Sequence, residues 1–357
     1  MPVTVIVGGQ FGGEGKGKVA YFLAQETNAH IAVRVGGTNS GHTVVDPSGT
    51  PVILRQLPTA ALLPNVTCVL GAGSYINPDI LLEEILRTGL LQDRLFIDPN
   101  AMIISEQERR EEESSSLRKS IGSTLSGTGA AVRKRISRET TVILAKNEKR
   151  LKQFIKPVVP YLRDNLSAGE RIIIEGTQGF GLSLLHSSDY PYVTSRDTTA
   201  AAFVSEAGIS PLDVDDIVLV IRAFPIRVGG NSGPLPNEID WDMVTRESKN
   251  NAPILEYTSV TKTVRRVARF DPNIVRQAIM VNQPTRIVLN HLDYIDTSCK
   301  HIDKLTDKAS EFVNEIELLI GEKIDYMGFG PASLVERTIK TKKIKSSMSN
   351  SFEEIKI

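Results

Sequence analysis

The stretch that decides the fold is Val3–Lys18, VTVIVGGQFGGEGKGK, an apolar β-branched run followed by a loop rich in glycine and lysine. The run predicts a buried strand, and Val19–Gln25 after it has a helical pattern. Glycines let backbone N–H groups close around a phosphate, the helix N-terminus favours the anion, and lysines neutralise it. The Walker-type spacing is present from Gly12 to Lys18, but Val19 stands where a hydroxyl would bind magnesium. The stretch therefore predicts a phosphate-binding loop that departs from an ordinary P-loop.

The composition excludes several classes of protein. The 357 residues include 42 basic and 42 acidic side chains, so no net charge attracts the chain to nucleic acid or to a membrane surface. The two cysteines, Cys68 and Cys299, are too few for a zinc knuckle or a disulfide framework and indicate a reducing compartment. Neither a signal peptide nor an apolar run of membrane-spanning length is visible. We therefore expect a cytoplasmic protein (in the host cytoplasm if viral) with neither nucleic-acid nor membrane partners.

Apolar runs typical of strands alternate with helical patterns along the chain. The further predicted strands are Ile31–Val35, Val66–Leu70, Leu95–Ile97, Arg171–Glu175, Ile217–Ile221 and Arg286–Asn290. The predicted helices include Pro78–Leu90, Arg150–Asn165 and Thr198–Gly208. This alternation predicts an α/β fold with a mostly parallel central sheet, helices on both faces and helical insertions. We expect one domain over residues 1–340, followed by a basic and polar tail over residues 341–357.

Polar loops follow several of the predicted strands, where parallel sheets bind their ligands. These loops are Gly8–Lys18, Gly36–Thr43, Gly176–Gly181 and Ala223–Asn237. In the second loop, His42 follows the sequence GGTNSG and could place a donor against charge developing on a phosphoryl or oxo group. The charged segment Glu106–Arg118 is expected to be a solvent-exposed helix face or a mobile loop.

The chain resembles the adenylosuccinate synthetase family. The resemblance is carried, in order, by GGQFGGEGKGK, GGTNSGHT, STLSGTGAAVRKRISR, EGTQGFGLSLLHSSDYPYVTSRDTTA, RAFPIRVGGNSGPLPNE, TSVTKTVRRVARFD, LNHLD and GFGPAS. It extends from residue 3 to about residue 333. The family's reaction is a phosphoryl transfer from a nucleoside triphosphate to O6 of a purine nucleotide. The amine of L-aspartate then displaces that phosphate at C6, because a phosphate ester leaves more readily than an oxo group.

The resemblance implies roles for individual residues. His42 matches the family's general acid, Lys16 matches a catalytic lysine, and Gly13 occupies the position of the catalytic aspartate. The residues matching the triphosphate site are Gly12, Gly13, Glu14, Gly15, Lys16, Gly17, Lys18, Gly41, His42, Thr43, Asn290, Asp293, Gly328, Gly330 and Pro331. Those matching the purine monophosphate site are Gly13, Asn39, Ser123, Thr124, Arg138, Gln178 and Thr194.

The remaining implied roles concern aspartate, magnesium and a second copy of the chain. Aspartate binding is implied for Val260, Thr261, Thr263 and Arg265. Mg²⁺ is implied as a cofactor, held in part at Gly13 and through the carbonyl of Gly41. Arg138 matches an arginine that reaches across a dimer interface to the nucleotide phosphate, so the resemblance implies a homodimer.

Four departures from the family pattern indicate a changed substrate. Gly13 replaces the aspartate that removes the purine N1 proton, which leaves room beside N1 for the 2-amino group of guanine. Thr263 replaces an arginine near the ribose 2′-hydroxyl, which weakens the case for a ribonucleotide. His291 replaces a lysine and GFGP replaces a serine-containing STGP, both beside the base of the triphosphate. These two changes favour ATP or dATP as the donor, whereas Asp293 suits guanine, so GTP is not excluded.

Together the departures resemble a viral branch of the family, the N6-succino-2-amino-2′-deoxyadenylate synthases. The leading hypothesis is therefore a ligase that joins L-aspartate to C6 of dGMP, for DNA containing 2-aminoadenine. The alternative is adenylosuccinate synthetase acting on IMP with GTP, with another base such as Glu14 recruited. A nucleotide-binding switch that lost catalysis is a third reading. The retained residues of a second nucleotide site, among them His42 and Gln178, argue against it.

Overall fold

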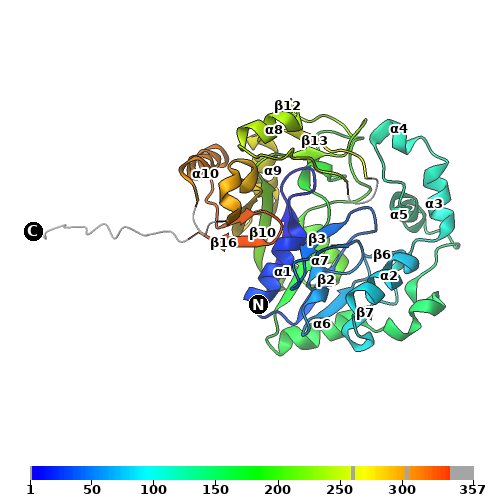
Figure 1. Ribbon diagram of the computed structural model, residues 1–357. Coiled ribbons are helices and arrows are strands. Elements are labelled where there is room, and N and C mark those ends of the chain that lie inside the picture. Colours follow the sequence, from blue (N-terminus) through cyan, green and yellow to red (C-terminus); the bar gives the residue numbers. More distant parts are fainter. Residues whose placement is uncertain (1, 259–261, 302–304, 338–357) are drawn as a thin grey trace, which may run out of the picture.

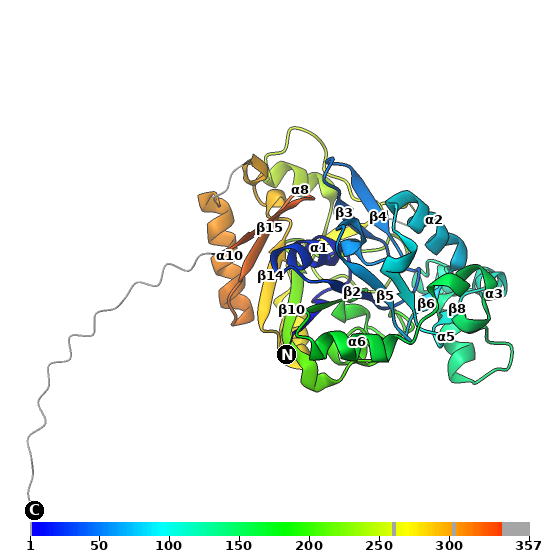
Figure 2. The ribbon, with the colours of Figure 1, turned by 90° about the horizontal axis from the view of Figure 1, so that it is seen from below.

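A nine-stranded sheet runs through the centre of the molecule (Figures 1 and 2). The structure is a computed structural model, and it describes residues 2–258, 262–301 and 305–337. In sheet order the strands are β16 (Ser333–Glu336), β15 (Tyr326–Phe329), β14 (Arg286–Asn290), β10 (Val214–Arg222), β1 (Val3–Gly8), β9 (Ile172–Glu175), β2 (Ile31–Arg34), β5 (Thr67–Leu70) and β7 (Leu95–Ile97). All neighbouring pairs are parallel except β15 and β16. The predicted fold class is thereby confirmed.

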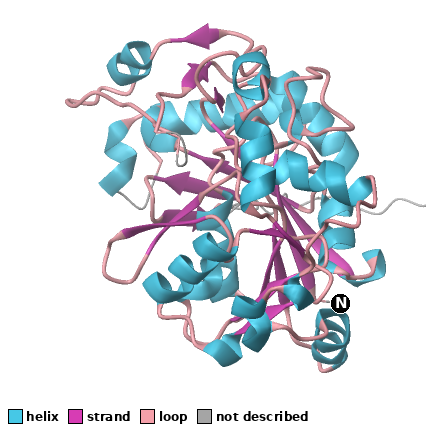
Figure 3. Ribbon diagram, turned by 90° about the vertical axis from the view of Figure 1, so that its right-hand side faces the viewer, coloured by secondary structure: helices cyan, strands magenta, loops and turns pink. Residues whose placement is uncertain are grey.

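Helices cover both faces of this sheet, as Figure 3 shows. They are α1 (Lys16–Glu26), α2 (Pro78–Thr88), α3 (Glu106–Glu113), α4 (Leu117–Ile121), α5 (Thr128–Ile136), α6 (Val158–Ser167), α7 (Ala200–Ala207), α8 (Trp241–Glu247), α9 (Pro272–Asn282) and α10 (Asp307–Ile320). Three small sheets join β11 (Ile226–Arg227), β13 (Arg266–Ala268) and β12 (Glu238–Ile239); β3 (His42–Val45) and β4 (Pro51–Leu54); and β6 (Tyr75–Ile76) and β8 (Met102–Ile103). In the part of the chain that the structure describes, no helix is long and apolar enough to cross a bilayer.

The first strand supplies both halves of the core because its side chains alternate between the two faces of the sheet. Val5 packs with the side chains of α6, α7 and α9 on one face. Its neighbour Ile6 packs with Val19 and Leu23 of α1 on the other. Burial on both faces explains why β1 is an uninterrupted apolar run, and it fixes the loop that follows at the carboxyl edge of the sheet.

The structure corrects two expectations about helices. The predicted helix over 150–165 is interrupted: a 3-10 turn covers Lys149–Phe154, and α6 begins only after its N-cap Pro157. The chain is extended before this proline, because its ring disfavours a helical conformation in the preceding residue. The charged segment after Ser105 does form α3, but not as a wholly solvated face. Its Glu112 is buried and accepts hydrogen bonds from two backbone N–H groups at the start of α5. The expected tail over 341–357 lies outside the described residues.

Candidate active site

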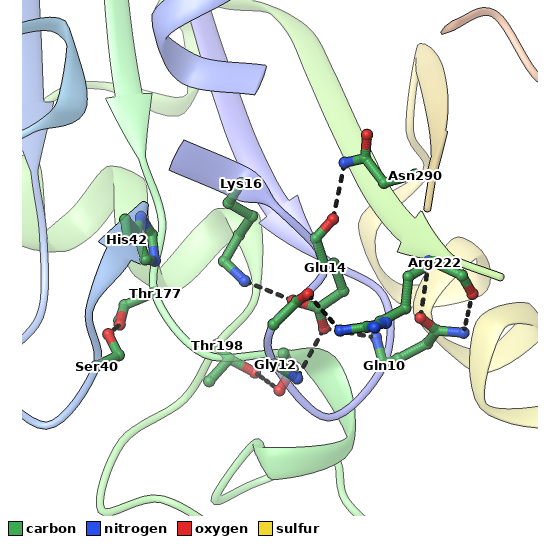
Figure 4. A network of polar contacts seen from close by, with 12 residues as sticks. Gln10, Gly12, Glu14, Lys16, Ser40, His42, Thr177, Thr198, Arg222 and Asn290 are labelled. Carbon is green, nitrogen blue, oxygen red and sulfur yellow. Dashed lines mark hydrogen bonds and ion pairs between the residues drawn. The ribbon is translucent and has the colours of Figure 1, made fainter. Parts of the chain in front are cut away.

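The glycine-rich loop between β1 and α1 is fastened to the sheet by side chains of its own sequence (Figure 4). Gln10 exchanges two hydrogen bonds with the backbone of Arg222 at the end of β10, at 2.9 and 3.1 Å. Glu14 accepts hydrogen bonds from the N–H groups of Gln10 and Gly12 with one oxygen, and lies 2.7 Å from the ammonium of Lys16 with the other. The loop is therefore shaped before any nucleotide binds, as electrostatic catalysis requires.

The burial of Glu14 bears on the alternative in which it replaces the missing base. Its side chain is fully buried, and both carboxylate oxygens already accept hydrogen bonds. A carboxylate engaged in this way holds the loop together and cannot abstract a proton from a purine without releasing Lys16. The geometry therefore opposes Glu14 as a base.

His42, at the start of β3, is held in a buried charged network. Its Nδ1 lies 2.5 Å from Oε1 of Glu175, which ends β9. The same oxygen accepts a hydrogen bond from Nη1 of Arg34, which ends the neighbouring strand β2, at 2.8 Å. Burial and the positive charge of Arg34 lower the pKa of His42 to about 3, so the ring is neutral at physiological pH. The second oxygen of Glu175 accepts from the N–H and hydroxyl of Thr59.

A pocket of about 490 Å³ opens above these loops and brings most of the predicted residues together. Its size is in the usual range for a small-molecule site. Predicted residues that line it are Gly12, Gly13, Gly15, Lys16, Gly17, Lys18, Asn39, Gly41, His42, Thr43, Thr124, Gln178, Arg265, Gly330 and Pro331. His291, which the sequence analysis placed beside the triphosphate base, also lines it, as do residues that the sequence reasoning did not assign to a site, including Phe11, Ile226, Arg227, Glu256 and Tyr257.

Other predicted residues lie outside the pocket wall or outside the described part of the chain. The described ones that do not line the pocket are Glu14, Ser123, Arg138, Thr194, Thr263, Asn290, Asp293 and Gly328. Thr194 nevertheless accepts a hydrogen bond from the pocket residue Asn39, at 3.3 Å. Arg138 is exposed beyond the end of α5, where it could serve a site other than its own. Val260 and Thr261 lie outside the described residues.

The expectation of open space beside residue 13 is wrong for this structure. A Cβ atom placed on Gly13 would collide with Nη1 of Arg265 and come within 2.5 Å of Cδ1 of Ile226. Both obstacles are the ends of flexible side chains. Gly13 also has a φ of +70°, a conformation that most side chains disfavour. The position is therefore filled by movable groups of the protein.

Glu256 lines the pocket close to residue 13, and the sequence analysis missed it. Its carboxylate forms an ion pair with the fully buried Arg222 and lies 3.6 Å from Nη1 of Arg265. Burial is the largest single influence and opposes its charge, but the combined attraction of Arg222 and its other positive neighbours outweighs burial and lowers the pKa of Glu256 to about 2. Arg222 also donates to the carbonyl of Gly13, at 2.9 Å. A charged arginine ending the apolar strand β10 is the sequence signal that could have revealed this cluster.

The region predicted to read the triphosphate base is joined to the phosphate loop. Asn290 donates to the carbonyl of Glu14 at 2.7 Å, and Asp293 accepts from the N–H of Gly330 at 2.9 Å. A Cβ on Gly328 would overlap the side-chain oxygen of Asn290. The departure at 328 is therefore linked to Asn290, because a serine at 328 would leave too little room for the Asn290 side chain.

Lys18 connects the same two regions. Its ammonium donates to the carbonyls of Gly330 and Ser333, each at 3.1 Å, and burial lowers the pKa of Lys18 to about 8. The predicted contact with phosphate would have to compete with these carbonyls. The lysine thus holds the segment from Gly330 to Ser333 against the glycine-rich loop.

The predicted magnesium ligands fit only in part. The carbonyl of Gly13 already accepts from the cationic Arg222, a position unsuited to a divalent cation. Gly41 lies in the pocket wall, where its carbonyl could meet a phosphate-bound ion. Among the residues that the structure describes, no group of three or more His, Cys, Asp or Glu side chains could hold a metal. The described residues therefore do not by themselves form a complete magnesium site.

Sequence comparison assigns the chain to a family. A model of the family described as "Adenylosuccinate synthetase" matches residues 5–148 and 139–299. The chain is 38% identical over 335 residues to the adenylosuccinate synthetase of Methanocaldococcus jannaschii, covering 92% of this chain and 94% of that protein. It is also 38% identical over 338 residues to the enzyme of Thermococcus onnurineus, covering 93% and 96%. The chain belongs to the adenylosuccinate synthetase family.

Two solved structures share this fold. The fold superposes on adenylosuccinate synthetase from Plasmodium falciparum with a TM-score of 0.83 at 23% identity, covering 94% of this chain and all of that one. It superposes on the succinoaminodeoxyadenylate synthetase of cyanophage S-2L, bound to dGMP and dATP, with a TM-score of 0.79 at 29% identity. That match covers 94% of this chain and 95% of the cyanophage chain. As a member of the family, the protein is a ligase that forms a C–N bond.

Proposed function

We propose that this ligase joins L-aspartate to C6 of dGMP at the expense of ATP or dATP. As N1 loses its proton to solvent, the 6-oxygen attacks the γ-phosphorus, forming an O6–P bond and breaking the bond to the β-phosphate. The aspartate amine then attacks C6 and releases inorganic phosphate with the former 6-oxygen. The product is N6-succino-2-amino-2′-deoxyadenylate, a precursor for DNA that contains 2-aminoadenine.

The observation that carries this proposal is the absence of a carboxylate at residue 13. An acid there suits a purine that presents only N1–H, whereas guanine presents a second N–H group beside it. Space for that 2-amino group depends on Arg265, whose guanidinium occupies the place of a residue-13 side chain. In the proposed complex, Arg265 turns towards the carboxylates of aspartate and vacates this place. The dGMP in the cyanophage structure, at 29% identity, supports the same substrate.

The pocket residues supply the groups that this reaction needs. The loop N–H groups, Lys16 and the N-terminus of α1 would bind the transferring phosphate, because together they concentrate positive charge at one point. His42 would donate a proton to, or stabilise charge on, the 6-oxygen. Mg²⁺ would be held chiefly by the triphosphate, with the carbonyl of Gly41 nearby. The exposed Arg138 would reach the monophosphate of a second copy in a homodimer.

Adenylosuccinate synthetase acting on IMP with GTP is the competing function. It is favoured by the 38% identity to archaeal enzymes of that name. It is opposed by the burial of Glu14, which removes the substitute base that this function would require. Asp293 is compatible with guanine in the donor, although one of its oxygens already accepts from Gly330.

A substrate panel separates the two functions. The purified protein, with Mg²⁺ and L-aspartate, is offered dGMP, GMP or IMP, each with ATP, dATP or GTP. Phosphate release and the succinylated product are followed together. We expect turnover of dGMP with ATP or dATP well above that of IMP with any donor. Turnover of IMP far above that of dGMP would overturn the proposal and establish the competing function.

A further inference from the structure

The pocket wall carries one cation that the roles assigned so far do not use. In the described part of the chain, the lysine and arginine side chains that line the pocket are Lys16, Lys18, Arg227, Lys262 and Arg265. Lys16, Arg227 and Arg265 each lie within 3.6 Å of a carboxylate of the protein, and Lys18 donates to two backbone carbonyls. Lys262 is exposed, and no ion pair or hydrogen bond with a described residue engages its ammonium. Its charge is therefore available to a ligand.

Backbone hydrogen bonds place Lys262 near Arg265. The N–H of Thr258 donates to the carbonyl of Thr263 at 2.9 Å, and the N–H of Arg265 donates to the carbonyl of Glu256 at 2.9 Å, so the two segments form the arms of a hairpin. Lys262 directly precedes the second arm, and its own N–H donates to the carbonyl of Thr258 at 3.2 Å. Lys262 and Arg265 therefore reach the pocket from the same short segment.

The backbone conformation of Lys262 is unusual for a lysine. Its φ of +55° lies in the region that glycine adopts readily and most side chains disfavour. Strained residues of this kind are concentrated at ligand sites. Lys249 is also exposed and has a φ of +57°, but it does not line the pocket. The conformation is therefore not enough to identify a site, and the position in the pocket wall is what distinguishes Lys262.

L-Aspartate needs positive charge at two points of its site. It carries two carboxylates, and once its amine is uncharged for the attack on C6, no cation of its own offsets them. Arg265 is shared with Glu256, 3.6 Å away, and Thr263 is uncharged where the family pattern has an arginine. A lysine ammonium is a compact charge on a flexible stem, so it can meet a carboxylate without the fixed geometry of a guanidinium. Lys262 is the neighbouring side chain that can supply the missing charge.

We propose that Lys262 is a binding residue for L-aspartate, holding one of its two carboxylates while Arg265 holds the other. In this arrangement the charge lost at residue 263 is restored by the adjacent residue. The inference rests on the proposed role of aspartate as the amine donor, but not on which purine is the substrate. It implies that the site selects a dicarboxylate, because a ligand with one carboxylate leaves one of the two cations without its partner.

Lys262→Met removes the charge and keeps most of the length of the side chain. We expect KM for aspartate to rise about tenfold, the loss of one charge-assisted hydrogen bond, with KM for the purine and the triphosphate nearly unchanged. Initial rates with whichever purine is turned over measure these constants. Lys262→Arg should restore most of the affinity, and Lys249→Met, the matched control, should leave all three constants in place. An unchanged KM for aspartate in Lys262→Met, or a rise confined to a nucleotide, would overturn the proposal.

Two further measurements distinguish this binding role from a structural role and from the proposed function. Lys262→Gly relieves the backbone, so it should raise KM for aspartate as Lys262→Met does, without lowering the thermal midpoint. A lowered midpoint with unchanged KM for aspartate would make Lys262 merely structural. NMR titration with ¹³C-labelled succinate, in the presence of ADP and either dGMP or IMP, gives a Kd without turnover. Succinate should bind about tenfold more weakly to Lys262→Met than to the wild type. If the wild-type protein turned over neither purine, the proposed function would fail, while equal succinate Kd values would overturn the role of Lys262 independently.

Discussion

The two walls of the pocket differ in how firmly their charges are held. Around His42, each oxygen of Glu175 accepts from protein donors, at 2.5–2.9 Å. On the opposite wall, Arg265 lies 3.6 Å from Glu256. The first wall follows the family's motifs and has the fixed charges that the proposed phosphoryl transfer would need. The second contains the departures and Arg265, which the proposed aspartate substrate would bind. In the proposed reaction, preorganisation is thus concentrated on the side where charge would develop.

Removing His42 should have the largest effect, since His42 is the expected proton donor on the first wall. We expect His42→Asn to reduce kcat by about 100- to 10,000-fold, the usual contribution of a general acid. Phosphate release with saturating substrates measures the change. His186→Asn is the control, because His186 does not line the pocket. Equal activity of the two variants would remove His42 from the chemistry.

Substitution at residue 13 tests the role of the second wall in choosing the purine. Gly13→Asp should reduce dGMP turnover and raise the ratio of IMP to dGMP turnover by about 10- to 100-fold, since a misplaced or missing proton acceptor has this order of effect. Aspartate tolerates the positive φ better than most residues, so the fold should survive.

Gly13→Asn is its matched control, equal in size but without a basic carboxylate. If both variants lose dGMP turnover and neither gains IMP turnover, the effect is steric. If dGMP turnover is unchanged in both, the 2-amino group does not face residue 13.

Arg265 should give a smaller effect, confined to one substrate. Arg265→Met should raise KM for aspartate by about tenfold, the loss of one charge-assisted hydrogen bond, with little change in KM for the purine. Arg266→Met is the control, because Arg266 pairs with Glu238 on β12. Initial rates measured at varied aspartate concentrations test this prediction. A rise in KM for the purine alone would place Arg265 at the nucleotide.

Lys18 should give the smallest effect and a dependence on pH. Burial lowers the pKa of Lys18 to about 8, so it is charged at pH 7 and largely neutral at pH 9. Loss of the charge weakens its bonds to Gly330 and Ser333, and KM for the triphosphate should rise about fivefold, on the order of 1 kcal/mol. Lys18→Met should start from a raised KM and show no such rise. A flat wild-type profile would contradict this assignment.

How much of the structure the sequence predicts depends on whether the interactions join residues that are near or far apart along the chain. Leu95–Ile97 and Arg286–Asn290 form strands with the predicted bounds, because β-branched and apolar runs report local burial. The pairing of Arg34 with Glu175 required knowing that β2 and β9 are neighbours, and no local pattern fixes strand order. Glu256 was missed for the same reason, since its partner Arg222 belongs to another element.

The prediction of open space beside residue 13 is wrong for a different reason. A missing side chain does not imply a void, since neighbouring flexible groups move to restore packing density. Arg265 and Ile226 do so here.

The link from Lys18 to Gly330 and Ser333 spans 312 and 315 positions of the chain. During synthesis the glycine-rich loop leaves the ribosome more than 300 residues before the carbonyls that hold Lys18. A nascent chain can therefore build α1 early, yet the ammonium of Lys18 gains these partners only after β15 has been made. Premature termination anywhere before β15 would release a protein in which Lys18 lacks both carbonyls.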